Sequence, residues 1–129
     1  MFIKVVAAVI KNNNKILIAR RKKGKHLEFK WEYPGGKLEN NEDEKSGLKR
    51  ELEEEFNIKA SVENYLTESF YEYDKVKINL KAYFVNDFLG SIKLTDHDKI
   101  EWVRINELQN YDFAPADIPI NNYLIKNGI

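Results

Sequence analysis

Four carboxylates lie in or beside one predicted helix of this chain, shortly after a glycine pair: Glu42, Glu51, Glu54 and Glu55. The last three are three and four residues apart, a spacing that places their side chains on one face of an α-helix. Like charges this close repel one another and raise one another's pKa values. A hard divalent cation relieves that repulsion, and Mg²⁺ commonly joins protein carboxylates to substrate phosphates. The pattern therefore indicates a metal site that binds a phosphate chain, with Mg²⁺ as the expected ion and Mn²⁺ as the alternative.

The helix that carries these acids is predicted over residues 42–56, beginning after Asn41. Asn is a favoured N-cap, and Glu44 three residues later completes a capping-box pattern. An apolar stripe runs beside the acids at four-residue steps and should pack on a sheet: Leu48, Leu52 and Phe56. A solvated face is the ordinary interpretation of a Glu-rich helix. The apolar stripe and the preceding Gly-Gly turn favour the metal site instead.

The stretch from Gly36 to Ile58 resembles the signature of the Nudix hydrolases, in which a glycine, a glutamate and an Arg-Glu run followed by a Glu pair recur at fixed spacing. Eight of the nine fixed positions match over 23 residues: Gly36, Glu42, Arg50, Glu51, Leu52, Glu54, Glu55 and Ile58. Asn57 stands at the ninth, where the family has Gly. Asn is the commonest other residue in the left-handed conformation that helix ends require. The departure should therefore cost about 1 kcal/mol at most and leave the acids unaffected.

The resemblance implies which residues bind metal. Glu51, Glu54 and Glu55 are expected to be ligands, with Glu51 sharing the work of a general base. A backbone carbonyl of Gly35 or Gly36 would add a further oxygen. Together these groups would hold the ion against the phosphates of a substrate, where a bound water can act as the nucleophile.

Further catalytic roles follow from the same resemblance. Arg50 is expected to steady an acid by bidentate pairing and not to touch substrate. Asp96 lies six residues before Trp102, where related enzymes hold a Glu that serves the metal or the base. Asp98 is a rival for that role, and a surface location for both loop acids is the plain alternative. Glu42 is expected to support the start of the helix.

Substrate contacts are implied at several positions. Lys37 is expected to approach a phosphate or to be a solvated loop residue. Arg21 is expected to contact phosphate or sugar, with Arg20 and Lys22 as substitutes and a plain basic surface as the alternative. Asp117 stands where MutT-type relatives read the base edge; a carboxylate suits an exocyclic amine such as cytosine N4, although Asp is also a favoured helix cap. Four aromatic residues could supply a stacking face: Tyr33, Phe70, Tyr71 and Tyr73.

The resemblance covers nearly the whole chain and is strongest to the MutT-type nucleoside triphosphate pyrophosphohydrolases. The run from Phe113 to Ile120, FAPADIPI, is especially similar to the CTP pyrophosphohydrolase branch. It implies hydrolysis of a (deoxy)nucleoside triphosphate to the monophosphate and pyrophosphate, as in nucleotide-pool sanitation and DNA repair. Cytidine-type substrates are the first expectation and oxidised purines such as 8-oxo-dGTP the second. The alternatives are another substrate, such as ADP-ribose or a dinucleoside polyphosphate, and a non-catalytic nucleotide-sensing module.

The composition limits the remaining classes. With 129 residues and 43% hydrophobic content, residues 1–129 are expected to form one domain, and the resemblance implies that it is a Nudix hydrolase domain. Basic and acidic residues number 21 each, so a nucleic-acid polymer, which calls for a basic surface, is not an expected partner. The chain has no Cys, which excludes thiol chemistry. No signal peptide or membrane-spanning run is evident, so a cytoplasmic monomer or homodimer is expected.

The predicted elements interleave helix and strand without strict alternation. Buried strands over residues 5–10 and 16–19 form a hairpin, and further strands are expected over residues 31–33, 60–73, 76–88 and 100–104. Asn106 is expected to cap a short helix that ends at Leu108. A terminal helix over residues 115–126 should pack through Ile118, Ile120, Tyr123 and Leu124. This order predicts an α/β (α+β) protein with a mixed β-sheet sandwiched between helices, and the resemblance implies that this is the Nudix fold.

Overall fold

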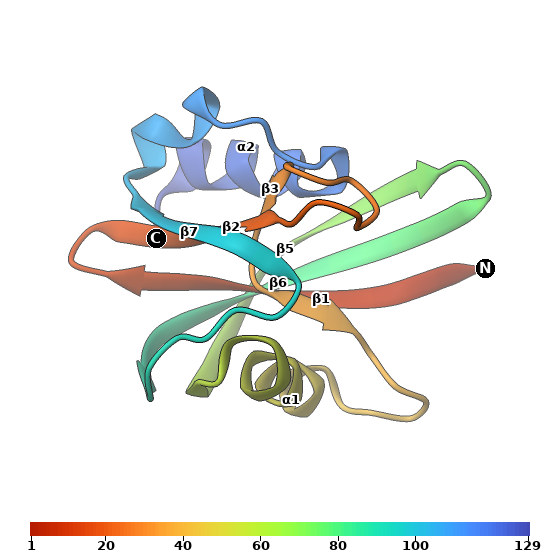
Figure 1. The fold of residues 1–129 in the computed structure, drawn as a ribbon, viewed down its shortest axis with the longest axis horizontal. Helices are drawn as coiled ribbons and strands as arrows, with labels where there is room; N and C mark the ends of the chain where they lie inside the picture. Colours follow the sequence, from red (N-terminus) through yellow and green to blue (C-terminus); the bar gives the residue numbers. More distant parts are fainter.

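One helix lies against each face of a mixed β-sheet in the computed structural model, which describes residues 1–129 (Figure 1). In chain order the elements are β1 (Phe2–Asn12), β2 (Lys15–Arg21), β3 (Trp31–Glu32), β4 (Gly35–Lys37), α1 (Glu44–Phe56), β5 (Lys59–Tyr73), β6 (Val76–Leu89), β7 (His97–Val103), the 3₁₀ helices η1 (Ile105–Asn110) and η2 (Pro115–Asp117), and α2 (Ile118–Asn127). The predicted α+β class, with its mixed sheet between helices, is confirmed. Neither helix is long and apolar enough to cross a membrane.

β1 is the central strand, and its neighbours run in both directions. The strand order is β3-β2-β1-β6-β5, with β4 paired to β1 and β7 paired to β2. β1 is parallel to β6, from Phe2 opposite Lys77 to Ile10 opposite Val85. It is antiparallel to β2 and β4. A parallel pair needs a long connection between its strands, and this connection carries α1 back across the sheet.

The apolar run of β1 is buried on both faces because successive side chains point to opposite sides of a sheet. Ala7 and Val9 belong to a core of 14 residues that also includes Ile120 and Leu124 of α2. Ala8, between them, belongs to a second core of 12 residues that includes the predicted stripe of α1: Leu48, Leu52 and Phe56. The side chains of that stripe are fully buried, as predicted, and they fix the face of α1 that remains for the acids.

The start of α1 differs from the prediction. The helix begins at Glu44, and its N-cap is Asp43, whose carboxylate accepts a hydrogen bond from a backbone N–H of the first turn. Asn41 lies before the helix in a left-handed turn with φ of 61°. Glu42 is held outside the helix because its carboxylate is bound by Arg50. The predicted N-cap at Asn41 was therefore wrong.

The end of α1 agrees with the prediction. The helix ends at Phe56, and Asn57 adopts the left-handed conformation, with φ of 59° and ψ of 33°. Its backbone N–H returns to Glu53 O, and its side-chain amide donates to Ser91 O at 3.1 Å. This side-chain bond offsets part of the strain of a residue other than glycine at positive φ.

Four other local predictions were wrong. The expected Gly-Gly turn is strand β4, Gly35–Lys37, paired with β1. η1 has Arg104, not Asn106, at its N-cap position. Ile118 is 43% exposed, whereas Ile120 and Leu124 of the same helix are fully buried. β7 begins at His97, three residues earlier than expected, because its first residues pair with the end of β2.

Candidate active site

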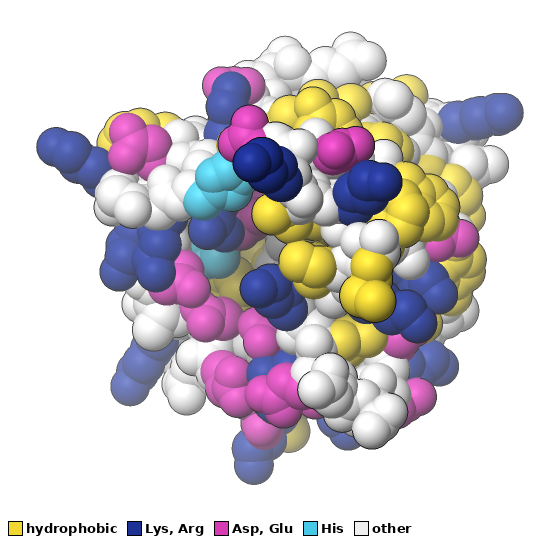
Figure 2. Space-filling view, turned by 90° about the vertical axis from the view of Figure 1, so that its right-hand side faces the viewer, with side chains coloured by type: hydrophobic (Ala, Val, Ile, Leu, Met, Phe, Trp, Pro, Cys, Tyr) yellow, Lys and Arg dark blue, Asp and Glu magenta, His cyan; other side chains and the backbone are white.

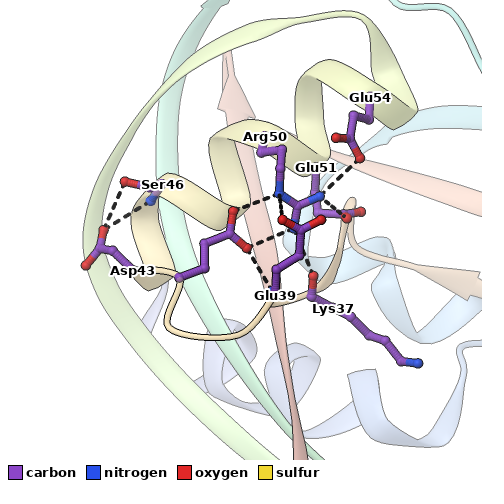
Figure 3. A network of polar contacts seen from close by, with 8 residues as sticks. Lys37, Glu39, Asp43, Ser46, Arg50, Glu51 and Glu54 are labelled. Atoms are coloured by element: carbon purple, nitrogen blue, oxygen red, sulfur yellow. Dashed lines mark hydrogen bonds and ion pairs between the residues drawn. The ribbon is translucent and has the colours of Figure 1, made fainter.

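Arg50 of α1 joins three acids of the signature, Glu42, Glu51 and Glu54, into one network (Figure 3). Its Nε and Nη2 donate to the two oxygens of Glu42 at 2.7 and 2.9 Å, which is the predicted bidentate pairing. Its Nη1 donates to Glu51 at 2.8 Å and to Glu54 at 3.1 Å, and Nη2 also reaches the carbonyl of Lys37 at 3.1 Å. The hydrogen bonds from Arg50 lower the pKa of Glu42 to about 2. Glu42 is thus a structural anion that ties the loop before α1 to the helix.

Glu51 lies where the helix meets β4. Its carboxylate packs against Gly36 so closely that a Cβ at that position would collide with it, so a larger residue there would displace the Glu51 carboxylate. The side chain is only 14% exposed. Burial raises the pKa of Glu51 against the opposing effect of Arg50. A partly buried carboxylate with a raised pKa is suited both to bind a cation and to accept a proton.

Glu55 and Asp96 meet at the other end of the acidic face. Thr95, just before β7, donates from Oγ1 to Glu55 Oε2 at 2.9 Å. Asp96 pairs with Lys25 Nζ at 3.0 Å. The hydrogen bond from Lys25 lowers the pKa of Asp96, and its interaction with the Glu55 carboxyl group lowers it further. Asp98, the rival position, is instead paired with an arginine of β2 at 2.9 Å, so Asp96 is the loop acid that lies near α1.

The acidic face suits a hard divalent cation in its donor atoms. Glu51, Glu54 and Glu55 present carboxylate oxygens, the ligands that Mg²⁺ and Mn²⁺ prefer. No three His, Asp or Glu side chains are gathered around a common point in this structure. Arg50 binds both Glu51 and Glu54, and Thr95 binds Glu55.

A pocket of about 360 Å³ opens on the other side of β4. Apolar residues of β1 and β6 form much of its wall, and Gly36 and Lys37 of β4 border it toward α1. Figure 2 shows acidic side chains gathered on the α1 side of this face, below a hollow bordered by basic, histidine and apolar side chains. A ligand in the pocket can therefore extend past β4 toward the acids.

Asp117 is the most deeply buried acid of the pocket, 6% exposed. Its Oδ2 accepts a hydrogen bond from the backbone N–H of Tyr33 at 3.0 Å. Burial raises the pKa of Asp117 well above its usual range, and the nearby charge of Glu32 raises it further. Asp117 also stands at the N-cap position of α2, but its side chain makes no capping hydrogen bond. The alternative that Asp117 only caps the terminal helix was therefore wrong.

Two predicted substrate residues line the pocket, and they differ in whether their charged groups already have partners. The Arg21 guanidinium is already engaged, donating to His26 O at 2.6 Å and to Glu32 Oε2 at 3.1 Å. Lys37 is exposed, forms no ion pair, and extends away from the carboxylates (Figure 3). Lys37 is thus the cation left free to meet a phosphate.

The aromatic candidates separate into two groups. Tyr33 and Tyr73 line the pocket. Tyr33 donates its hydroxyl hydrogen to Asn121 of α2 at 2.6 Å, so its ring is a fixed wall. Phe70 and Tyr71 are 59% and 38% exposed and lie outside the pocket lining.

Glu32 and His26, which also line the pocket, were not identified as site residues from the sequence. Each stands in a short segment without periodicity. Only the pairing of β3 with β2, which sets Glu32 opposite Ala19, brings Glu32 to the pocket. The Trp31-Glu32-Tyr33 run next to the glycines was the one available hint.

A mixed sheet between two helices, with an acidic helix face and a nucleoside-sized pocket meeting across a glycine strand, defines a class of enzymes that act on phosphate anhydrides. Comparison with known proteins gives the family: the NUDIX domain matches residues 1–124, and the chain belongs to the Nudix family. The predicted MutT-like Nudix hydrolase is confirmed, and such hydrolases generally need a divalent metal.

Individual relatives cover most of the chain. The CTP pyrophosphohydrolase of Escherichia coli (strain K12) is 39% identical over 118 residues, 92% of this chain and 87% of that protein. The 8-oxo-dGTP diphosphatase of Escherichia coli (strain K12) is 31% identical over 119 residues, 92% of each. The solution structure of the E. coli ORF135 protein superposes with a TM-score of 0.87 at 37% identity, covering 97% of this chain and 89% of that one.

Proposed function

We propose that this protein hydrolyses a (deoxy)nucleoside triphosphate to the monophosphate and pyrophosphate, with Mg²⁺ as the cofactor and Mn²⁺ as a substitute. One observation carries the proposal: Gly36 borders the pocket on one side and receives the Glu51 carboxylate on the other. A nucleoside in the pocket would therefore direct its phosphates to the acidic face of α1. Lys37, free at the same border, would pair with a phosphate.

The roles of the acids follow from their environments. Glu51, Glu54 and Glu55 would hold the metal, with Asp96 and a carbonyl of Gly35 or Gly36 as further donors. A divalent metal bound there would neutralise phosphate charge and lower the pKa of a bound water. Glu51 Oε2, the oxygen that Arg50 leaves free, is suited to accept a proton because burial raises its pKa. Arg50 would act by holding these acids in place.

The polar groups of the pocket support base recognition. Glu32 is an acceptor, and the raised pKa of Asp117 favours its protonated form, which can donate. A donor beside an acceptor complements the N3 and N4 edge of cytosine and also suits a purine edge. The names of the relatives support both choices, CTP and 8-oxo-dGTP. Such a reaction would serve nucleotide-pool sanitation in the cytoplasm.

The test is a substrate panel. The purified protein is incubated with Mg²⁺ and CTP, dCTP, 5-methyl-dCTP, dGTP, 8-oxo-dGTP or ADP-ribose, and pyrophosphate and inorganic phosphate are measured separately. We expect pyrophosphate from triphosphates, with one base preferred. Glu54→Gln protein, prepared in the same way, controls for contaminating phosphatases. Cleavage of ADP-ribose alone would assign another nucleoside diphosphate derivative, and binding without cleavage would assign a nucleotide-sensing module.

A further inference from the structure

His97, the first residue of β7, is a buried polar side chain that neither the acidic face nor the pocket wall explains. Its side chain is 3% exposed. The ring stacks on Phe56, the last residue of α1, with centroids 5.1 Å apart and planes at 29°. Nε2 lies 2.7 Å from Glu32 Oε2, and Nδ1 has no partner. A buried polar group in this state needs a reason.

The contact with Glu32 assigns the hydrogen of the ring. Glu32 Oε2 already accepts a hydrogen bond from Arg21, and it faces Nε2 of His97, so Nε2 is assigned as the donor of this contact. Nδ1 has no hydrogen-bond partner. The ring therefore offers Glu32 one directed hydrogen bond, and its stacking on Phe56 fixes the plane of the ring.

The pairing of β2 with β7 explains how the donors converge. Arg20 lies opposite Lys99, so a regular antiparallel register would set Arg21 opposite Asp98. The register shifts between Arg20 and Arg21, and Arg21 lies opposite His97 instead. Directly paired residues of an antiparallel ladder project from the same face, and a bulge re-aims side chains at such a point. The irregularity therefore sends Arg21 and His97 to the same carboxylate.

Only one oxygen of Glu32 is used by this clamp. Oε2 accepts from Arg21 Nη1 at 3.1 Å and from His97 Nε2 at 2.7 Å. Oε1 accepts no hydrogen bond from the protein, and Glu32 lines the pocket. The two donors thus fix the carboxylate through Oε2 and leave Oε1 available to a ligand in the pocket.

We propose that His97 is a positioning residue for substrate specificity, which together with Arg21 orients Glu32 so that its Oε1 reads the base edge. This inference rests on the proposed function for its choice of ligand. It assigns no contact between His97 and substrate. Its effect must therefore pass through Glu32 and appear in discrimination between bases more than in the rate of hydrolysis.

Two substitutions separate the hydrogen bond from the packing. His97→Phe keeps a ring over Phe56 and loses the donor, whereas His97→Gln keeps a donor and loses the ring. Lys99→Gln, an exposed change on the same strand, is the matched control. Values of kcat and KM are measured with dCTP, dGTP and 8-oxo-dGTP. We expect His97→Phe to reduce the ratio of kcat/KM between the best and second-best base about tenfold, as for a lost hydrogen bond to a charged group. The change should lie mainly in KM, and His97→Gln should restore most of the ratio.

Glu32→Ala tests whether the effect passes through Glu32. In that background, adding His97→Phe should change the ratio no further. An unchanged ratio in His97→Phe alone, an equal loss on all three nucleotides, or a persistent effect without Glu32 would overturn the inference. If the wild type hydrolyses none of the triphosphates, the proposed function fails, and calorimetric binding of the same nucleotides still tests His97. If His97→Phe does not fold, the imidazole ¹⁵N shifts of wild type serve: an Nε2 that carries no hydrogen would contradict the assignment.

Discussion

Carboxylates at the two ends of the site lie in opposite surroundings. On α1, Glu54 is 56% exposed and shares the Arg50 guanidinium with three other acids. In the pocket, Asp117 is 6% exposed and its one partner is a backbone N–H. The first arrangement gives the acids a cationic partner, and the second favours a neutral acid. A carboxyl group thus supplies negative charge at one end of the site and a specific hydrogen-bonding pattern at the other.

The sharpest way to break this comparison is to remove one charge from α1. Glu54→Gln preserves shape and should lower kcat by about 100-fold or more, roughly 2.7 kcal/mol in the activation free energy, because a metal-binding charge is lost. The melting temperature should change little, since Glu54 is largely exposed. Pyrophosphate release and thermal melts measure the two effects. The exposed neighbour Glu53→Gln is the control; retained activity in Glu54→Gln would remove Glu54 from the metal site.

Arg50→Lys tests whether the charged end depends on one guanidinium. A lysine cannot reproduce the bidentate pairing with Glu42 while also reaching Glu51. We expect the free energy of unfolding to fall by about 2 kcal/mol, measured by urea denaturation, and kcat to fall with it. Lys49→Gln, one residue earlier and exposed, should be neutral. Wild-type stability in Arg50→Lys would show that the network is only a surface feature.

The neutral end predicts a particular pH dependence. Because burial raises the pKa of Asp117 in the folded state, its contribution to stability is fully present below the usual value of 3.8 and is lost as pH rises toward the raised value. Asn has no carboxyl group to ionise, so the Asp117→Asn variant should not lose stability in this way as the pH rises. Between about pH 5 and 7 the variant should gain at least about 1 kcal/mol relative to wild type, up to about 1.4 kcal/mol per pH unit. Parallel stability curves in urea titrations across this range would show that Asp117 is ionised in the fold.

The smallest effect is expected at the one departure from the family signature. Asn57→Gly relieves the positive φ but loses the hydrogen bond to Ser91. The unfolding free energy should change by less than about 1 kcal/mol, and turnover should not change, because Asn57 touches none of the acids. A large change in turnover would mean that the end of α1 takes part in the reaction.

The charged end could be predicted from sequence because it is local. The signature residues lie within 23 positions of one another, and helix geometry alone places Glu51, Glu54 and Glu55 on one face. The error was at the start of α1. Asn41 and Asp43 are both favoured N-cap residues, and the structure uses Asp43 because Arg50 binds the Glu42 carboxylate and keeps Glu42 outside the helix.

The pocket could be predicted only in part because its contacts are remote. Asp117 meets Tyr33 across 84 residues, and His97 meets Glu32 across 65. Asp117 was found through the family resemblance. Glu32 and His97 were missed because their meeting depends on the register of β2 with β3 and β7, which no periodicity in the sequence specifies.

The central claim is that α1 performs the reaction and the pocket chooses the base. The most direct test measures kcat/KM on the nucleotide panel for wild type, Glu54→Gln and Asp117→Ala. Glu54→Gln should lower every value by a similar factor and keep the ranking of substrates. Asp117→Ala should change the ranking while the best triphosphate is still hydrolysed at a rate near that of wild type. An unchanged ranking in Asp117→Ala, or a changed one in Glu54→Gln, would contradict the division.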